Sequence, residues 1–324
     1  MTQSVAIILL NWNSYKDTKE CMESLELLDY ATYHVYVVDN ASTDGSAERL
    51  KKDDQEALYS FEWTFLASPR NLGFAGGNNI AIKQASIEGF DFIWLLNNDT
   101  EVEAQSLSTL VEPMLVDHTI GITGSKIYFA NSDVIWFAGG KINARNGAHA
   151  HIGMRKKDQG QFDQKKDVNY IVGCSLLIRS EIVQEIGVLE EDYFLYYEDV
   201  DWNLRALEKG WRIQYIPTSI IWHKVSQSIK SSELSALSTY YIIRNAYVMA
   251  VKFHEKPFQV RACLRLGRNI IWYHLKIIIR KQDHKRRRSA LIFAAAGDAL
   301  KGKTGQFVQQ KTKMRTTYGT RKSS

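Results

Sequence analysis

Three short apolar runs, separated by stretches with helical spacing, constrain the fold of this chain more than any other feature. The runs occupy residues 5–10, 34–39 and 91–96. Apolar residues recur at helical spacing between residues 18 and 28, and residues 79–88 predict a further helix. Continuous apolar strands that alternate with helices are typical of a parallel sheet that is buried on both faces. The sequence therefore predicts an α/β fold with a mainly parallel central sheet.

Downstream of residue 100 the alternation becomes irregular. Strands are predicted at residues 121–129, 134–137 and 170–179, with a polar segment over residues 144–166. A helix is predicted from about Ser180, and the pattern is helical from about Ser232 to the end. We therefore expect one domain over residues 1–230, partly of mixed sheet, and a helical C-terminal region over residues 231–324.

The composition fits a globular protein of the cytoplasm. With 324 residues, 45% hydrophobic content and 24% charged content, the chain can bury one large core. Cys21, Cys174 and Cys263 are far apart and match neither a disulfide framework nor a zinc site. The first residues carry no cationic segment, and the apolar run after them is too short for a signal sequence or a spanning helix. We therefore expect a cytoplasmic location.

Charge divides the chain into an acidic body and a basic tail. Residues 226–324 hold 21 Lys and Arg against 4 Asp and Glu, a net charge of +17, whereas residues 1–225 hold 20 against 32, a net charge of −12. This asymmetry predicts that the tail meets a polyanion, either an anionic membrane surface or nucleic acid. Because the acidic body disfavours broad contact with nucleic acid, we expect no nucleic-acid partner, and binding of nucleic acid through the tail alone is the alternative.

The tail contains a predicted amphipathic helix between residues 260 and 280. Its cations and its apolar residues recur at steps of three and four on different sides: Arg261, Arg265, Arg268, Lys276 and Arg280 on one, Leu264, Ile271, Leu275 and Ile278 on another. Lys281 and a basic run at residues 285–288 follow. Either this helix lies on an anionic membrane, or it packs on the body with a solvated basic face. The chain has no apolar run of about 18 residues, so a spanning helix is not expected.

Three carboxylates within four positions, at Glu198, Asp199 and Asp201, open a predicted helix. Confined carboxylates repel one another and shift each other's pKa, so such a cluster is typical of a site that uses a base, a cation or a polyhydroxyl ligand. Acidic residues in a first helical turn also complement the helix macrodipole. The cluster therefore predicts either a reaction centre or a stabilised helix start.

Polar segments follow the predicted strands at the edge where open α/β sheets bind ligands. Asp39 begins one of these turns and fits either a helix cap or a contact to a nucleobase or ribose. Glycine-rich residues 71–79 open the next helix and fit either an anion site or an ordinary tight turn. Asp99, beside two amides, suits a hard divalent cation with diphosphate oxygens, and His223 is either a further ligand or a structural histidine.

The order of these motifs is more specific than any one of them. The chain reads Asn-Trp-Asn at 11–13, Val-Asp-Asn-Ala-Ser-Thr-Asp-Gly at 38–45, Asn-Leu-Gly-Phe-Ala-Gly-Gly-Asn-Asn at 71–79 and Tyr-Glu-Asp-Val-Asp at 197–201. With residues 97–99 and His223, this order closely resembles the GT-A glycosyltransferases of glycosyltransferase family 2, over roughly residues 4–230. The amino-acid sequences of these motifs are most similar to those of bacterial rhamnosyltransferase-type enzymes. The resemblance implies a GT-A, Rossmann-like nucleotide-diphospho-sugar transferase domain, followed by the basic helical extension.

The resemblance implies roles for the matched residues. Asp199 would be the catalytic base, and Asp99 would bind Mn²⁺ or Mg²⁺ at the end of the family's Asp-X-Asp motif, with His223 as a second ligand. The resemblance also implies that the donor is bound by Asn11, Asp39, Asn71, Gly73, Asn98 and Asp99. The acceptor would be bound by Gly173, Cys174, Glu198 and Asp201. Arg244 would contact a diphosphate. The alternatives for Asp201 are to orient Arg205 or to cap the helix.

One position departs from the family pattern. Asn97 stands where the Asp-X-Asp motif begins with an aspartate. An amide oxygen is a neutral ligand, so the resemblance implies a site that binds metal weakly until a nucleotide diphosphate arrives.

The implied reaction is a single in-line displacement with inversion. An acceptor hydroxyl attacks the anomeric carbon of a nucleotide sugar, Asp199 accepts the proton, and the nucleoside diphosphate leaves. The expected donor is dTDP-rhamnose, with a UDP-hexose as the alternative. The expected acceptor is a glycan, linked to a polyprenyl diphosphate, in cell-surface polysaccharide synthesis at the inner face of the plasma membrane. A non-catalytic GT-A scaffold that only binds nucleotide or a partner is the competing interpretation.

Overall fold

The computed structural model describes residues 3–143, 148–225, 232–253, 256–280 and 282–308. In the N-terminal half, strands and helices alternate. The elements are β1 (Val5–Asn11), α1 (Tyr15–Leu25), β2 (Tyr33–Asp39), α2 (Ser46–Gln55), β3 (Trp63–Ala67), α3 (Gly73–Glu88) and β4 (Phe92–Asn97). β2 and β4 both pair in parallel with β1, and β3 pairs in parallel with β2. The prediction of a mainly parallel sheet with alternating helices is therefore confirmed.

The second half adds antiparallel strands to this sheet. Its elements are β5 (Thr100–Val102), α4 (Ser106–Val116), β6 (Ile120–Phe129), β7 (Ile135–Phe137), β8 (Gly140–Asn143), β9 (Ala148–His151), β10 (Lys166–Val168), β11 (Ser175–Arg179), α5 (Ser180–Ile186), η1 (Glu191–Tyr193), α6 (Glu198–Glu208) and β12 (Arg212–His223). β11 runs antiparallel between β4 and β6, which gives the order β10-β12-β6-β11-β4-β1-β2-β3. The second half is thus mixed, as its irregular pattern indicated.

The parallel register brings polar strand ends together. β1, β2 and β4 are apolar along most of their length and mostly buried, as Ile7, Val37 and Ile93 illustrate. Pairing places Asn11 at the end of β1 beside Asp39 at the end of β2, and Leu10 beside Asn97 at the end of β4. Because side chains become polar only where the strands end, the sheet has one polar edge.

Two predicted boundaries differ from the structure. The glycine-rich segment forms the first turns of α3, which begins at Gly73. Gly73 has a φ of +73°, and a Cβ there would overlap the backbone of Phe194, so a larger residue would push the two segments apart. The predicted strand at residues 170–179 begins only at Ser175, because the chain turns before it and directs the Gly173 N–H toward Asp199 at 3.0 Å.

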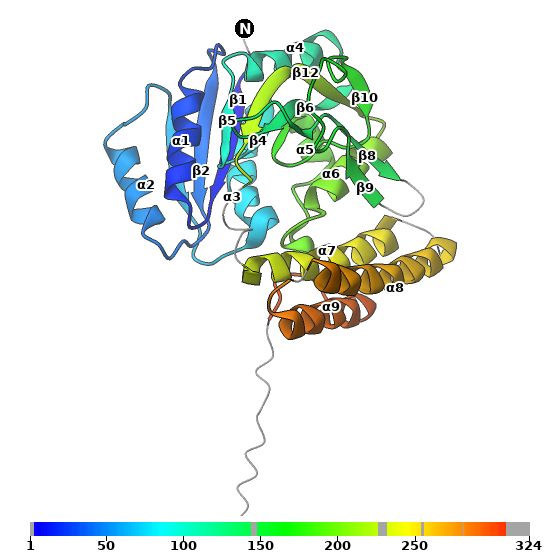
Figure 1. The fold of residues 1–324 in the computed structure, drawn as a ribbon. Coiled ribbons are helices and arrows are strands. Elements are labelled where there is room, and N and C mark those ends of the chain that lie inside the picture. The colour runs from blue at the N-terminus through cyan, green and yellow to red at the C-terminus, as the bar shows by residue number, and fades with distance from the viewer. Residues whose placement is uncertain (1–2, 144–147, 226–231, 254–255, 281, 309–324) are drawn as a thin grey trace, which may run out of the picture.

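Three helices follow the sheet domain and lie together on one side of it (Figure 1): α7 (Ser232–Phe253), α8 (Lys256–Ile279) and α9 (Lys285–Leu300). α7 and α9 share a second buried cluster that includes Ile243, Ile292 and Ala295, while Met249 of α7 belongs to the main core. The helical pattern from Ser232 agrees with the prediction up to Leu300. Residues 301–308 are not helical. The predicted domain boundary near residue 230 falls outside the described residues.

The predicted apolar side of α8 faces solvent. Leu264 is 71% exposed, Ile271 63% and Ile278 66%, and the helix packs through Leu266 and Ile277 instead. The helix thus packs on its neighbours with exposed cations such as Arg268, as one predicted alternative stated, but its predicted apolar side is exposed as well. In the ranges that the structure describes, no helix has both the length and the apolar character needed to cross a membrane.

Candidate active site

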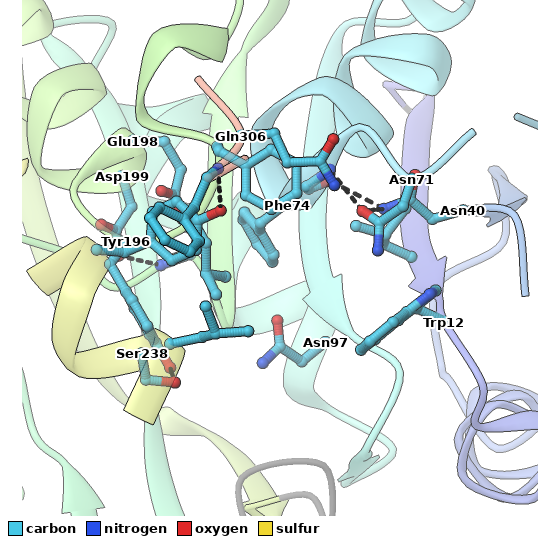
Figure 2. Close-up of a pocket in the computed structure, with 18 of the residues that line it drawn as sticks. Trp12, Asn40, Asn71, Phe74, Asn97, Tyr196, Glu198, Asp199, Ser238 and Gln306 are labelled. Carbon is cyan, nitrogen blue, oxygen red and sulfur yellow. Dashed lines mark hydrogen bonds between the residues drawn. The ribbon is translucent and has the colours of Figure 1, made fainter. Parts of the chain in front are cut away.

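A cavity of about 1000 Å³ lies where the polar edge of the sheet meets the C-terminal helices (Figure 2). We call its two sides the strand half and the helix half. The strand half includes Trp12, Asn40, Asn71, Asp99, Asp199 and His223. The helix half comes from α7, α9 and the segment after α9, and includes Ser238, Tyr241, Arg287, Ala294, Gly297 and Gln306.

Asp199 is held in a fixed orientation at the start of α6. Its Oδ2 accepts a hydrogen bond from the Tyr170 hydroxyl at 2.8 Å and another from the Gly173 N–H at 3.0 Å. These two donors fix the direction of the carboxylate toward the cavity wall that Gly173 forms. Figure 2 shows Asp199 on the opposite side of the cavity from Trp12 and Asn71.

A strained turn places the acidic residues at the cavity. Phe194, Tyr196 and Tyr197 have φ values of 63°, 66° and 79°, in the left-handed region that non-glycine residues rarely adopt. Each such residue costs about 1–3 kcal/mol and persists only where the surroundings enforce it. The enforcing contacts come from α7, where the Asn245 side-chain amide donates to the carbonyls of residues 193, 195 and 196 at 2.8–2.9 Å.

Glu198 also lines the cavity, and one of its oxygens has no protein partner. The side chain is 5% exposed, and the buried Oε2 makes no hydrogen bond. Burial, followed by the charges of Asp199 and Asp201, raises the pKa of Glu198 well above its ordinary value. A protonated Glu198 can donate one hydrogen bond and accept others, which suits a ligand hydroxyl.

Asp99 and His223 form a pair at the edge of the strand half. The antiparallel pairing of β12 with β5 aligns His223 with Thr100, and Nε2 of His223 lies 3.0 Å from Oδ1 of Asp99. Burial alone would lower the pKa of His223, but Cys174 and Asp99 outweigh burial and raise this pKa to about 10. Nδ1 of His223 is buried without a hydrogen-bond partner. The pair thus presents a carboxylate and an imidazolium to the cavity at one point, and a metal ion that binds Nε2 would replace its proton.

These two residues fit a hard divalent cation that shares its ligands with substrate. Among the described residues, no group of three or more His, Cys, Asp or Glu side chains converges as a metal site. Mg²⁺ sites commonly use one or two protein ligands and leave the other positions to water and phosphate oxygens. Asn97 and Asn98 line the cavity beside the pair. The donor set therefore suits a metal ion that binds together with a diphosphate.

The remaining predicted donor residues divide into two groups. Asn71, Gly73 and Asn98 line the cavity, whereas Asn11 and Asp39 are almost fully buried behind it. Asn11 donates to Oδ1 of Asp39 at 2.7 Å. Asp39 and Asn11 therefore support the cavity wall in this structure.

Comparison with known proteins agrees with this geometry. The model of the family Glycosyl transferase family 2 matches residues 5–187. The chain belongs to glycosyltransferase family 2. This confirms the family assignment made from the ordered motifs.

The names of two relatives of this glycosyltransferase describe rhamnosyl transfer. N-acetylglucosaminyl-diphospho-decaprenol L-rhamnosyltransferase of Mycobacterium tuberculosis is 23% identical over 313 residues, which is 90% of this chain and 99% of the relative. The dTDP-rhamnosyl transferase RfbF of Shigella flexneri is 22% identical over 313 residues, which is 94% of this chain and 98% of the relative. The resemblance to rhamnosyltransferase-type enzymes is therefore confirmed as a likeness.

A solved structure with the same fold is a mannosyltransferase of Pyrobaculum calidifontis in complex with GDP-Man and Mn²⁺. The two chains share 15% identity and superpose with a TM-score of 0.59, over 93% of this chain and 88% of the other. This likeness confirms the GT-A fold of the glycosyltransferase.

Asp201 does not face the cavity of the glycosyltransferase, contrary to the predicted acceptor contact. The side chain is fully buried and lies 2.5 Å from Nε of Arg205 and 2.7 Å from Nζ of Lys252. Arg205 in turn donates to the carbonyl of Val188 at 2.9 Å. Asp201 therefore orients Arg205, as one of the predicted alternatives stated, because its position one helical turn before Arg205 directs it into the core.

Arg244 does not face the cavity either, although a diphosphate contact was predicted for it. It is 1% exposed, and its guanidinium donates to the carbonyl of Gly305 at 2.6 Å and to that of Tyr193 at 3.0 Å. Its position on α7 places it between the turn before α6 and the segment after α9. Arg244 is thus a clamp that joins the two halves of the site.

Sequence reasoning missed several cavity residues. Trp12 and Asn40 belong to motifs that were recognised, so their positions next to Asn11 and Asp39 were the available signal. Gln306 had no such signal, and neither had Tyr170, which is buried behind the cavity and holds Asp199. Figure 2 shows the amide end of Gln306 directed toward Asn40 and Asn71, although it follows them by more than two hundred residues.

Proposed function

We propose that this glycosyltransferase moves a sugar from a nucleotide donor to a hydroxyl of a glycan acceptor, with inversion at the anomeric carbon. The best candidate donor is dTDP-rhamnose, supported by the names of the two relatives. The observation that supports the proposal most is that the Asp99–His223 pair and the oriented Asp199 carboxylate line one cavity. A UDP-hexose is the alternative donor.

Each protein group has a defined task in this proposal. Asp199 accepts the proton of the attacking hydroxyl, while Tyr170 and Gly173 hold its carboxylate in place. Gly173 and Cys174 line the acceptor side, and burial raises the pKa of the Cys174 thiol. Asp39 and Asn11 support the wall against which the nucleoside lies.

A divalent cation is part of the proposal. Asp99 and His223 would hold Mn²⁺ or Mg²⁺. The metal ion would neutralise the charge that grows on the leaving diphosphate. The neutral amide of Asn97 leaves this site with less negative charge than two aspartates would. We therefore expect the metal and the nucleotide diphosphate to strengthen each other's binding.

A donor screen tests the proposed function. Purified protein is incubated with Mn²⁺ or Mg²⁺ and a panel of dTDP-, UDP- and GDP-sugars, and release of nucleoside diphosphate is measured with and without a lipid-linked glycan acceptor. Release that is selective for dTDP-rhamnose and needs the acceptor is expected. Release from another donor would replace rhamnose, and absence of both binding and release for every donor would overturn the catalytic proposal in favour of a scaffold.

The proposal also places the enzyme on the inner face of the plasma membrane. The exposed apolar side of α8 carries Leu264, Ile271 and Ile278, and exposed cations such as Arg268 lie on the same helix. Apolar area combined with positive charge is the feature that binds helices to anionic lipid surfaces. The lipid-linked acceptor named for the Mycobacterium tuberculosis relative is consistent with such a location.

Vesicle sedimentation tests the membrane contact. We expect binding to vesicles that contain phosphatidylglycerol, and loss of binding in the double variant Ile271→Asp, Ile278→Asp. Ile87→Asp is the matched control, because Ile87 is 80% exposed on α3 of the body. Equal sedimentation of the double variant and the control would contradict the proposed contact.

A further inference from the structure

The segment after α9, residues 301–308, lines part of the cavity, but the proposed chemistry uses none of it. Its cavity-lining residues are Lys301, Lys303, Gln306 and Phe307. The segment is neither helix nor strand, so its path is set by contacts with other parts of the molecule. Loops that a rigid scaffold holds at a ligand site are a common source of binding residues.

Two contacts fix this segment on either side of Gln306. The carbonyl of Gly305 accepts a hydrogen bond from the buried guanidinium of Arg244 at 2.6 Å. The backbone N–H of Phe307 donates to the Tyr241 hydroxyl at 2.9 Å. Gly305 has a φ of +73°, which turns the chain in a way that other residues rarely allow. Gln306 is therefore held in one place, although its own side chain is exposed.

The amide of Gln306 is directed toward Asn40 and Asn71 (Figure 2). Asn40 is engaged within the protein, because its Nδ2 donates to Oδ1 of Asn71 at 3.2 Å and to the carbonyl of Gly73 at 3.0 Å. Oδ1 of Asn71 also accepts from the N–H of Gly73 at 2.8 Å. In the part of the chain that the structure describes, neither the Gln306 amide nor Nδ2 of Asn71 has a hydrogen-bond partner. These two groups are therefore available to a ligand.

The same part of the cavity suits a nucleobase. Trp12 lines the cavity on the side of Asn40 and Asn71, opposite Asp199 (Figure 2). Indole rings stack on the faces of nucleobases, and polar side chains read base edges by hydrogen bonds. The proposed diphosphate site at Asp99 belongs to the same half of the cavity. A nucleoside that is attached to this diphosphate can therefore reach the free amides.

The free groups match the edge of a thymine or uracil base, which carries an N–H donor between two carbonyl acceptors. The Gln306 amide supplies an acceptor and a donor, and Nδ2 of Asn71 supplies a further donor. Guanine instead carries two adjacent donors beside one carbonyl, so it needs two acceptors. The second acceptor is missing, because Oδ1 of Asn71 is engaged with Asn40 and Gly73. The two amides therefore favour thymine or uracil over guanine.

We propose that Gln306 determines the specificity for the donor by binding, together with Asn71, the edge of its thymine or uracil base while the base stacks on Trp12. This inference rests on the proposed glycosyl transfer and adds to it a residue that selects the nucleotide. The segment after α9 thus belongs to the donor site. Arg244 connects this segment to the turn that carries the carboxylates, because it also donates to the carbonyl of Tyr193 at 3.0 Å.

Binding of nucleoside diphosphates tests the proposal without any turnover. Affinities for dTDP, UDP and GDP are measured by calorimetry on the full chain in the presence of Mn²⁺. We expect wild type to bind dTDP and UDP at least about tenfold more tightly than GDP. Gln306→Glu should lower this preference by about tenfold, because a carboxylate cannot donate to a base carbonyl but accepts from both guanine donors.

Gln55→Glu is the matched control for the added charge. Gln55 is exposed on α2 and lies outside the cavity, so its affinities should equal those of wild type. General repulsion of the diphosphate, or a contact from Gln306 to ribose, would weaken all three ligands equally in Gln306→Glu. An unchanged ratio of dTDP to GDP affinity in that variant, or a wild type that prefers GDP, would overturn the inference.

A second pair of variants tests whether the anchored segment positions Gln306. The ring of Phe307 packs against that of Tyr240, with the two centroids 4.5 Å apart. Phe307→Ala removes this contact and should lower the preference for dTDP over GDP by about threefold, because Gln306 is no longer fixed before the donor binds. Val308→Ala is the control, because Val308 is 77% exposed outside the cavity. A lower unfolding temperature of Phe307→Ala with an unchanged affinity ratio would contradict the positioning role.

The proposed function and this inference fail in distinguishable ways. If wild type binds neither a nucleoside diphosphate nor a nucleotide sugar, the proposed function fails and the inference with it. If wild type transfers sugar from a nucleotide donor and Gln306→Glu keeps the wild-type ratio of affinities, the function stands and the base is read by other residues.

Discussion

The strand half and the helix half of the cavity are built differently. In the strand half, polar side chains hold one another: Asn11 donates to Asp39 at 2.7 Å, and Asn40 donates to the carbonyl of Gly73 at 3.0 Å. The helix half offers a small, apolar helical face with cations at one end. The difference teaches that one cavity can combine a wall fixed by hydrogen bonds between neighbouring strand ends with a face whose position depends on how distant helices pack.

Asp199→Asn should produce the largest effect, and it is confined to the strand half. The amide keeps the shape of the side chain but cannot act as a base, so transfer should fall by about 10²–10⁴-fold while nucleotide affinity is retained. Initial rates of nucleoside diphosphate release and calorimetric titration measure the two quantities. Turnover close to wild type would exclude Asp199 as the base.

Arg244→Ala tests whether the contacts of Arg244 hold the strand half and the helix half of the cavity together. Removing the guanidinium leaves the carbonyls of Tyr193 and Gly305 without their donors, and we expect the free energy of unfolding to fall by about 3 kcal/mol. Transfer should fall with it, because the turn that carries the carboxylates loses support. Denaturant unfolding and rate measurements check this. Arg268→Ala, on the exposed side of α8, is the control, and identical unfolding curves for the two variants would contradict the clamp.

Asp99→Ala should affect only the strand half. We expect Mn²⁺ and nucleotide diphosphate affinity to weaken together, by about tenfold or more, because the two ligands share one site. Calorimetry with dTDP in the presence and absence of Mn²⁺ measures the coupling. Nucleotide binding that keeps its full dependence on Mn²⁺ would exclude Asp99 as a ligand.

Glu198→Gln should have the smallest effect. We expect it to change how the free energy of unfolding depends on pH. Burial raises the pKa of Glu198 above the unfolded value near 4.5, so its protonated form stabilises the folded state. This stabilisation is complete below the unfolded pKa and is lost as pH rises through the folded pKa. Glutamine does not titrate, so the variant should gain stability over wild type with rising pH, by up to about 1.4 kcal/mol per pH unit. Thermal unfolding at several pH values checks this, and a constant difference would contradict the raised pKa.

The sequence predicted the fold and the polar strand ends because these follow from local patterns. Apolar runs with helices between them require a parallel sheet, and the carboxyl ends of its strands must meet at one edge. Asp99 and His223 were located in this way, whereas Asn71 came from a glycine-rich loop and Glu198 and Asp199 from a carboxylate cluster at a helix start. All five line the cavity.

The sequence did not predict the roles of Asp201 and Arg244 correctly. Both are charged residues in motifs that resemble a site, but each is buried against partners that are distant in the chain, Lys252 for Asp201 and Gly305 for Arg244. A carboxylate or guanidinium has the same appearance in a sequence whether it faces a ligand or satisfies the protein's own polar groups. Only the position of α7, next to Asp201, to the turn before α6 and to the segment after α9, decided between these roles.

By itself, the sequence determined the parallel sheet, the family, and the candidate residues at the strand ends, because hydrophobic periodicity and short motifs act over a few neighbouring residues. The tertiary structure alone decided that α7 and α9 complete the cavity, that Gln306 is directed toward Asn40 and Asn71, and that the apolar side of α8 is exposed. The physical reason is that these features depend on how helices far apart in the chain pack on the sheet, and small residues such as Ala294 and Gly297 gain meaning only from the space beside them.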